Sequence, residues 1–248
     1  MNSNEVVIDV QNLVKKFGQF AANDNLTFKV YKGEIFGFLG ANGAGKTTAI
    51  RIMSGLLEPT SGKIDVAGFN AYTQRDLIKA NIGYMSQKFS LYDDLTVKEN
   101  IRFFGGIYGL NRKTLKNRID ELLTDLKMYN FKDELISSLP LGWKQRLSFS
   151  VAMIHKPKII FLDEPTGGVD PITRRGFWEM IYQVAGQGTT VFVTTHYMDE
   201  AEYCDRVTIM VDGKIEALDT PANLKKKFNV SSMDEVFIIL ARNGKTVA

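Results

Sequence analysis

The sequence predicts an α/β fold in which a parallel sheet carries an inserted α-helical subdomain. Nearly continuous apolar runs at 34–39, 159–162 and 189–194 are typical of strands that are buried on both faces. Segments with helical spacing separate these runs, as expected when helices join the strands of a parallel sheet. Between 96 and 155 the apolar residues recur at helical spacing among many charges, which predicts the inserted subdomain.

The elements before the insertion are mainly strands. Residues 6–10 and 26–31 alternate apolar and polar side chains with period two, which is typical of half-buried strands. The first buried run then leads through a glycine-rich loop into a helical segment at 48–57. Glycine turns bound a further short strand within 61–68, and residues 81–86 form another. We expect these strands to make up the first half of the sheet.

Helices dominate the insertion, and the sheet resumes after it. One predicted helical face carries the apolar residues Leu115, Ile119, Leu122, Leu123 and Leu126. After the insertion, a helical segment at 172–184 separates two of the buried runs, as in a parallel sheet. Short strand-like pieces follow at 207–211 and 236–241.

Length and composition fit one domain with an insertion. The chain has 248 residues, of which 44% are apolar, and this is enough to bury a sizeable core. We place the domain at 1–221, its helical insertion at about 88–156 and a short C-terminal tail at 222–248. No apolar run approaches the roughly 20 residues that a helix needs to cross a bilayer.

Charge and cysteine content narrow the class of protein. The 31 Lys and Arg residues against 28 Asp and Glu leave a net charge of only +3, which gives no general footprint for nucleic acid. The single cysteine, Cys204, excludes an internal disulfide framework. Residues 1–10 lack the basic and apolar regions of a signal peptide. We expect a cytoplasmic protein that binds no nucleic acid.

The glycine-rich loop matches the complete phosphate-binding pattern G-x-x-x-x-G-K-[ST] between a strand and a helix. Main-chain N–H groups in such a loop surround the phosphates, and the positive end of the following helix faces them. Lys46 supplies a point charge, and the Thr47 hydroxyl is expected to bind Mg²⁺. An incidental glycine turn explains neither the spacing nor the flanking elements. The predicted ATP-binding residues of the loop are Gly40, Asn42, Gly43, Ala44, Gly45, Lys46, Thr47 and Thr48.

Two carboxylates end the buried run at 159–162. Asp163 can complete the Mg²⁺ coordination, and Glu164 can align and activate a water molecule. A solvated acidic pair at a strand end is the alternative, but this pair follows four apolar residues in a chain that also carries a phosphate loop. The motifs therefore predict a nucleoside triphosphatase.

These motifs resemble the ATP-binding cassette (ABC) family, because further features recur in that family's order between 6 and 221. The resemblance implies a P-loop NTPase (RecA-like) core with a small antiparallel β subdomain and the inserted α-helical subdomain. Gln87 is similar to the family's Q-loop residue, a Mg²⁺ and water contact. His196 resembles the switch histidine that contacts the γ-phosphate. Asp170 resembles the D-loop aspartate at the dimer interface, although Asp-Pro is also a plain helix start. His155 lies at a predicted helix end, where a surface role fits better.

Phe17 lies where the family places the aromatic residue that stacks on adenine, an interaction of about 1 to 3 kcal/mol in comparable base stacking. Phe20 is a nearby competitor for this role. The alternative is that Phe17 is an aromatic residue of the core.

The segment 139–146, Leu-Pro-Leu-Gly-Trp-Lys-Gln-Arg, aligns with the family signature but differs at two positions. In the family, a serine hydroxyl and glycine amides of this segment meet the γ-phosphate on the opposite subunit. Pro140 has neither a hydroxyl nor an N–H group, and Leu141 is bulky. Gly142 and the amides at the start of the next helix can still face the phosphate. The variant resembles cassettes of the type-two exporter group.

The resemblance implies partners as well as chemistry. It implies a homodimer, or a heterodimer with a related cassette, bound to a membrane-spanning subunit on the cytoplasmic face of the membrane. In the family, a coupling helix of the membrane subunit docks beside the segment 88–95, for which the candidate contacts are Phe89, Leu91, Tyr92, Phe103 and Phe104. An internal core of the helical lobe is an equal alternative for these residues. A GTPase or small-molecule kinase does not need the signature helix, and the better rival is a non-transport ABC ATPase that acts on ribosomes or DNA.

Overall fold

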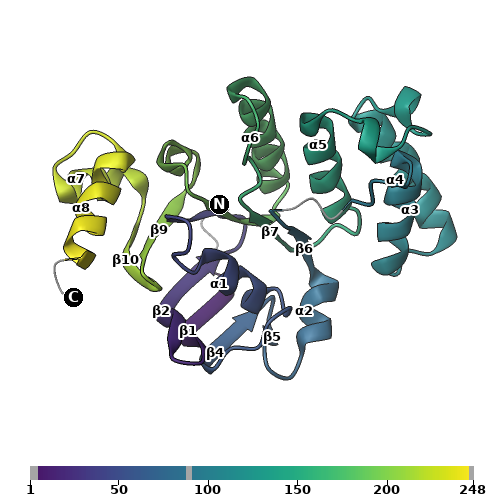
Figure 1. Ribbon diagram of the computed structural model, residues 1–248. Coiled ribbons are helices and arrows are strands. Elements are labelled where there is room, and N and C mark those ends of the chain that lie inside the picture. The colour runs from purple at the N-terminus through teal and green to yellow at the C-terminus, as the bar shows by residue number, and fades with distance from the viewer. Residues whose placement is uncertain (1–4, 88–90, 246–248) are drawn as a thin grey trace.

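Two β-sheets form the centre of the chain in the computed structural model, which describes residues 5–87 and 91–245 (Figure 1). Their strands are β1 Val6–Phe17, β2 Phe20–Tyr31, β3 Ile35–Gly40, β4 Ser61–Val66, β5 Phe69–Asn70, β6 Ile82–Met85, β7 Ile159–Asp163, β8 Thr190–Thr195, β9 Arg206–Val211 and β10 Lys214–Asp219. The helices are α1 Lys46–Met53, α2 Arg75–Asn81, α3 Val97–Ile107, α4 Arg112–Asp125, α5 Leu141–Ala152, α6 Pro171–Gly186, α7 Pro221–Phe228 and α8 Met233–Lys245. Short 3₁₀ turns lie at η1 Tyr129–Phe131, η2 Ile136–Ser138 and η3 Met198–Tyr203.

The strand orders confirm the predicted α/β core. The larger sheet has the order β10-β9-β3-β8-β7-β6, in which β10 runs antiparallel to β9 and the other neighbours pair in parallel. The smaller sheet has the order β2-β1-β4-β5 and is antiparallel throughout. Because β3 has neighbours on both sides, the glycine loop that follows it lies at the middle of the larger sheet's edge.

The buried strands send alternate side chains into two different cores. On β3, Phe36 and Phe38 face the smaller sheet and α1, whereas Ile35 and Leu39 face the helices on the opposite side. The ring of Phe192 on β8 lies 5.6 Å from that of Phe36 and 5.2 Å from that of Phe38, measured between centroids. Burial of each such side chain stabilises the fold by about 1.5 to 3 kcal/mol. This packing explains why the strand is apolar at every position.

A helical lobe of α3, α4 and α5 has its own apolar core and lies beside the edge strand β6 (Figure 1). Its first helix begins with a capping box, in which the Thr96 hydroxyl accepts from the Glu99 backbone and the Glu99 carboxylate accepts from that of Thr96. At the start of α4, the Asn111 side chain accepts a hydrogen bond from the backbone N–H of Thr114. The lobe confirms the α-helical subdomain, and its helices lie within the predicted 88–156.

The end of the chain differs from the prediction. The segment 236–241, which we expected to be strand-like, is part of helix α8. Met233, Val236 and Leu240 of this helix are buried in the core on the side of the larger sheet that the helices cover. Their spacing of three and four residues is helical. Described residues of the predicted tail thus form α7 and α8 and contribute to the core. None of the helices in the described parts of the chain is long and apolar enough to cross a membrane.

Candidate active site

The glycine loop connects β3 to the first turn of α1. Gly45 has a φ of 98° and precedes the helix, and a Cβ atom there would lie only 2.1 Å from the Ala22 carbonyl oxygen. A Cβ atom at Gly40 would lie 2.7 Å from the Met210 carbonyl oxygen. Neither position therefore accepts a larger residue without a shift of the backbone. The positive end of α1 faces the loop, as a phosphate site requires.

Lys46 is buried at the start of α1, and its ammonium group has three partners. Its Nζ atom lies 2.8 Å from the carbonyl oxygen of Gly40, 3.1 Å from that of Ala41 and 3.1 Å from Oε1 of Glu164. The lysine thus connects the loop to the carboxylate at the end of β7. A buried cation with an anionic neighbour can contact a phosphate without first losing a shell of bulk water.

The Glu164 carboxylate lies at the centre of the site. Its Oε2 atom accepts a hydrogen bond of 3.0 Å from Nε2 of Gln87 and lies 3.0 Å from Nδ1 of His196. The backbone of Glu164 has a φ of 48°, and its N–H donates to Thr194. A left-handed backbone is uncommon at a residue other than glycine and is often found at functional sites. Three separate segments, which carry Lys46, Gln87 and His196, thus converge on one carboxylate.

Asp163 lies deeper, at the end of β7. Its Oδ1 atom accepts from the Thr47 hydroxyl at 3.1 Å and from the Thr194 hydroxyl at 2.8 Å. Burial raises the pKa of Asp163 above its usual value, and the two hydroxyl bonds act in the opposite direction. The Thr47 and Asp163 oxygens form the pair that the sequence predicts for a metal.

A cleft of about 320 Å³ opens above the loop. Most of the predicted residues line it: Phe17, Asn42, Gly43, Gly45, Lys46, Thr47, Thr48, Gln87 and Glu164. Gly40 and Ala44 are buried and do not line the cleft. Phe17 is 52% exposed, which excludes the core alternative, and Phe20 at 64% lines the same cleft. The choice of stacking residue between the two stays a prediction.

Gly142 and Asp170 lie apart from this cleft and together line a second groove. Asp170 caps α6 by accepting from the N–H groups of Ile172 and Thr173. Gly142 packs on α6, since a Cβ atom there would lie 2.9 Å from Cγ2 of Thr173. The signature start and the aspartate are therefore neighbours on the surface of a single chain.

Two residues of the site, Thr194 and Asn23, were not identified from the sequence. Thr194 binds both carboxyl-bearing residues, and Asn23 is fully buried with its Nδ2 atom 3.1 Å from the Gly45 carbonyl oxygen. Thr194 is a polar residue in a fully buried strand, and this is the signal that could have identified it. Asn23 lies on β2, where buried and exposed residues alternate, so its burial has no comparable signal in the sequence.

His155 does not have the expected surface role. Its ring stacks on that of Tyr108 with centroids 3.7 Å apart, and its Nε2 atom lies 3.0 Å from the Ile82 carbonyl oxygen. Burial lowers the pKa of His155 to about 4. The residue therefore connects the helical lobe to the edge strand β6 as a neutral ring.

Comparisons with known proteins agree with this geometry. Residues 23–167 match the family described as ABC transporter. The chain is 49% identical over 221 residues to the probable multidrug ABC transporter ATP-binding protein YbhF of Escherichia coli (strain K12), covering 89% of this chain but only 38% of that protein. It is 35% identical over 246 residues to the linearmycin resistance ATP-binding protein LnrL of Bacillus subtilis (strain 168), covering 96% of this chain and 79% of that protein.

A solved structure shows the same architecture. The dimeric structure of a post-hydrolysis state of the ATP-binding cassette MJ0796 bound to ADP and Pi superposes with a TM-score of 0.77 at 25% identity, covering 86% of this chain and 98% of that one. These matches do not support the alternative of an ATPase that acts on ribosomes or DNA.

Proposed function

The chain belongs to the ABC transporter family of ATP-binding proteins, and we propose that it hydrolyses MgATP as the cytoplasmic, peripheral subunit of an exporter. The observation that carries the proposal is the Glu164 carboxylate, which contacts Lys46, Gln87 and His196 above a phosphate loop. An isolated phosphate loop does not require this convergence. The names of YbhF and LnrL favour a drug-like substrate.

The residues present fit a magnesium ion that is bound together with a nucleotide. The Thr47 hydroxyl and the Asp163 carboxylate supply two hard oxygen ligands on one side of the cleft. Among the residues that the structure describes, no three His, Cys, Asp or Glu side chains are grouped to hold a metal. This suits Mg²⁺, which takes its remaining ligands from phosphates and water and neutralises charge as phosphate is transferred.

In the proposed reaction, the chain's own groups position ATP and direct the attacking water. The Lys46 ammonium exchanges part of its contact with loop carbonyls and Glu164 for contact with the outer phosphates. Glu164 is then free to accept a hydrogen bond from the water and to direct it in line with the γ-phosphate. Gln87 and His196, which hold the same carboxylate, are placed to respond to the γ-phosphate.

Two copies, or this chain and a related cassette, are proposed to complete each site. Gly142 and Asp170 form a groove that shares no lining residue with the cleft over the phosphate loop. The groove can therefore serve the nucleotide of a second subunit, and the dimeric form of the similar MJ0796 cassette supports this arrangement.

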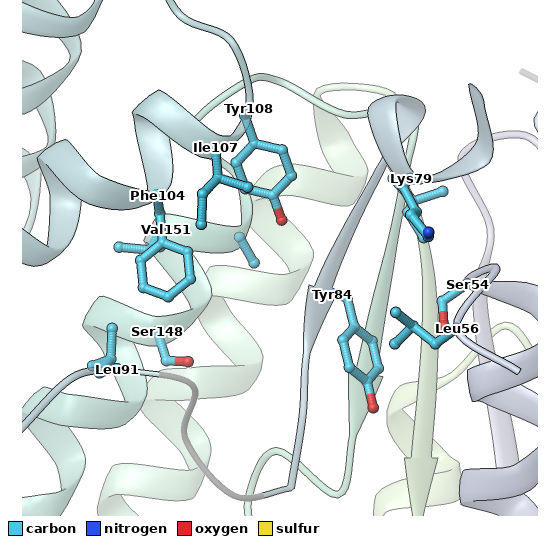
Figure 2. A pocket seen from close by; sticks show the side chains of 12 residues that line it. Ser54, Leu56, Lys79, Tyr84, Leu91, Phe104, Ile107, Tyr108, Ser148 and Val151 are labelled. Atoms are coloured by element: carbon cyan, nitrogen blue, oxygen red, sulfur yellow. The ribbon is translucent and has the colours of Figure 1, made fainter. Parts of the chain in front are cut away.

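The membrane-spanning partner is proposed to dock in an apolar cleft of about 270 Å³ between the helical lobe and the core (Figure 2). Figure 2 shows Phe104, Ile107 and Val151 on the lobe side, facing Tyr84 and Leu56 across the opening. The full lining is Ser54, Leu56, Lys79, Ile82, Tyr84, Leu91, Phe104, Ile107, Tyr108, Ser148, Val151 and Ala152.

The candidate contacts from the sequence divide between this cleft and the lobe's own surface. Leu91 and Phe104 line the cleft and also pack on the core of the lobe. Tyr92 and Phe103 are exposed, with ring centroids 4.8 Å apart. Phe89 lies outside the described residues.

Titration calorimetry with MgATP tests the nucleotide function directly. The wild-type chain should bind MgATP, and Lys46→Ala should abolish most of the binding because the buried cation of the phosphate site is lost. Lys214→Ala, a change of an exposed lysine on β10, is the matched control and should bind normally. Folded wild-type protein that binds no MgATP would contradict the proposal.

A further inference from the structure

Arg174 lies one turn into α6, after the capping residue Asp170, and reaches the loop that carries the switch histidine. Its guanidinium carbon lies 4.1 Å from the centroid of the Tyr197 ring. Its Nε atom lies 3.7 Å from Oε1 of Glu200, and its Nη1 atom lies 3.6 Å from Oδ2 of Asp199. The side chain is only 20% exposed, so these contacts are partly shielded from water.

Glu200 is a fully buried carboxylate with an incomplete set of partners. Its Oε1 atom accepts a hydrogen bond of 2.6 Å from the hydroxyl of Thr166, two residues after Glu164. Within the described part of the chain, neither Oε2 of Glu200 nor Nε of Arg174 has a hydrogen-bond partner. A buried carboxylate needs a nearby cation, and Arg174 is the cation that the structure places beside it.

Tyr197 connects this arginine to the catalytic carboxylate. The Tyr197 ring lies 4.2 Å from the ring of His196, measured between centroids, and His196 contacts Glu164. The guanidinium therefore packs on one ring, that ring packs on the histidine, and the histidine holds the carboxylate. The three contacts form a continuous path from α6 to the site.

We infer that Arg174 is a positioning residue for His196. It ties α6, which begins at the groove containing Asp170 and Gly142, to residues 196–200, which lead into η3. Movement of α6 when a second subunit covers that groove thus reaches His196 through the arginine and Tyr197. This inference rests on the proposed ATPase function and deepens it by naming how the groove communicates with the cleft.

The inference differs from a purely structural role in what it predicts for kinetics. A structural anchor would lower the fraction of folded protein and leave turnover per folded molecule unchanged. A positioning residue lowers kcat with little change in KM, because ATP contacts the phosphate loop rather than the arginine. Misplacement of a catalytic group costs on the order of 10² in rate, so we expect Arg174→Met to lower kcat by roughly 10- to 100-fold.

The test compares Arg174→Met with Arg175→Met on the purified chain. Arg175 is the next residue of the same helix and its side chain is 85% exposed, so its variant should keep wild-type kcat and KM. Arg174→Lys keeps the charge beside Glu200 but lacks the planar group over Tyr197, and it should recover only part of kcat. Calorimetric MgATP affinity should be the same in all four proteins.

A double-mutant cycle tests the path through the tyrosine. Tyr197→Leu removes the ring and should lower kcat as Arg174→Met does, whereas Tyr197→Phe keeps the ring and should not. If Arg174 acts through this ring, the double variant with Tyr197→Leu should be no slower than the slower single variant.

Three results would overturn the inference. They are an unchanged kcat in Arg174→Met, a fall in kcat matched by an equal fall in MgATP-binding sites, and fully additive effects in the cycle. A wild-type chain that binds and hydrolyses no MgATP would instead contradict the proposed function, so the two failures can be told apart.

Discussion

The Nδ1 atom of His196 and the Nε2 atom of Gln87 both lie 3.0 Å from the same oxygen, Oε2 of Glu164. The other carboxylate oxygen of Glu164 lies 3.1 Å from the Lys46 ammonium. Segments that are up to about 150 residues apart in the chain therefore meet at one side chain. A change of charge at Glu164 should alter the chemistry of the site more than its shape.

Glu164→Gln should abolish hydrolysis and preserve ATP binding. Glutamine fills the same volume but cannot act as a base for water, and loss of a general base costs roughly 10² to 10⁴ in rate. The substitution removes the charge beside Lys46 but leaves the glycine loop and the carbonyl contacts of Lys46 in place, so MgATP affinity measured by calorimetry should stay within a few-fold of wild type. Phosphate release in steady state is the measurement of turnover.

Glu216→Gln is the matched control, because Glu216 is an exposed residue of β10. Its turnover should equal that of the wild type. Wild-type turnover in Glu164→Gln would show that another group activates the water.

The signature segment should respond to a change toward the family pattern. Pro140 precedes α5 without any side-chain cap, and Leu141 is 43% exposed, so neither side chain is essential to the packing. Pro140→Ser with Leu141→Gly supplies a hydroxyl and a close backbone approach. One preorganised donor is worth about 10² to 10³ in rate, and we expect a clear rise in kcat, up to that range.

The double variant and the wild type are compared by steady-state phosphate release at saturating MgATP. A helix-capping serine stabilises α5 by about 1 kcal/mol and glycine at its first position costs up to about the same, so a thermal melt should show little change in stability. An unchanged or lower kcat in a folded variant would mean that the Leu-Pro-Leu-Gly segment is not what limits turnover.

The order of elements and the residues of the phosphate site were predictable because both depend on local sequence patterns. Buried parallel strands are nearly continuous apolar runs, as on β3 and at residues 159–162 of β7, and a phosphate loop needs fixed spacing between its glycines and Lys46. Gln87 and His196 were predicted from the resemblance of their motifs to the family. In the structure both side chains contact the Glu164 carboxylate.

Contacts between distant segments were not predictable in this way. The strand-like piece at 236–241 is a helix because its apolar residues pack on the larger sheet at helical spacing. His155 is half-buried because Tyr108, the residue that ends α3, stacks on its ring. The pairing of Arg174 with Glu200 likewise depends on how α6 packs beside η3 and not on either local sequence.

His155 should make the fold sensitive to mild acid. Its pKa is about 4 in the folded chain and 6.5 when unperturbed. Between these values the unfolded chain binds a proton that the folded chain does not bind, so the free energy of unfolding falls as the pH falls from 6.5 toward 4. Above pH 6.5 the residue is neutral in both states and this effect vanishes.

Urea unfolding at pH 7.5 and at pH 5 measures this contribution. His155→Gln keeps a donor for the Ile82 carbonyl but has no proton to bind, so its loss of stability between the two pH values should be smaller than that of the wild type. We expect a difference of about 1 kcal/mol, after reducing the ideal slope for partial exposure of the ring. Equal losses in both proteins would show that His155 is not the titrating group.

The apolar cleft in Figure 2 should be required for assembly but not for hydrolysis. Ile107 is 61% exposed at the cleft and has no contact with the phosphate site, so Ile107→Lys should leave the ATPase activity of the isolated chain unchanged. A charge in an apolar docking site loses its hydration when a partner binds, and this weakens binding. Ile107→Lys should therefore sharply reduce the amount of membrane subunit that copurifies with the tagged chain from detergent extracts. Ile238→Lys is the matched control, since Ile238 is 46% exposed on α8, and it should recover the subunit as the wild type does. Equal recovery with Ile107→Lys and with the wild type would place the docking site elsewhere on the chain.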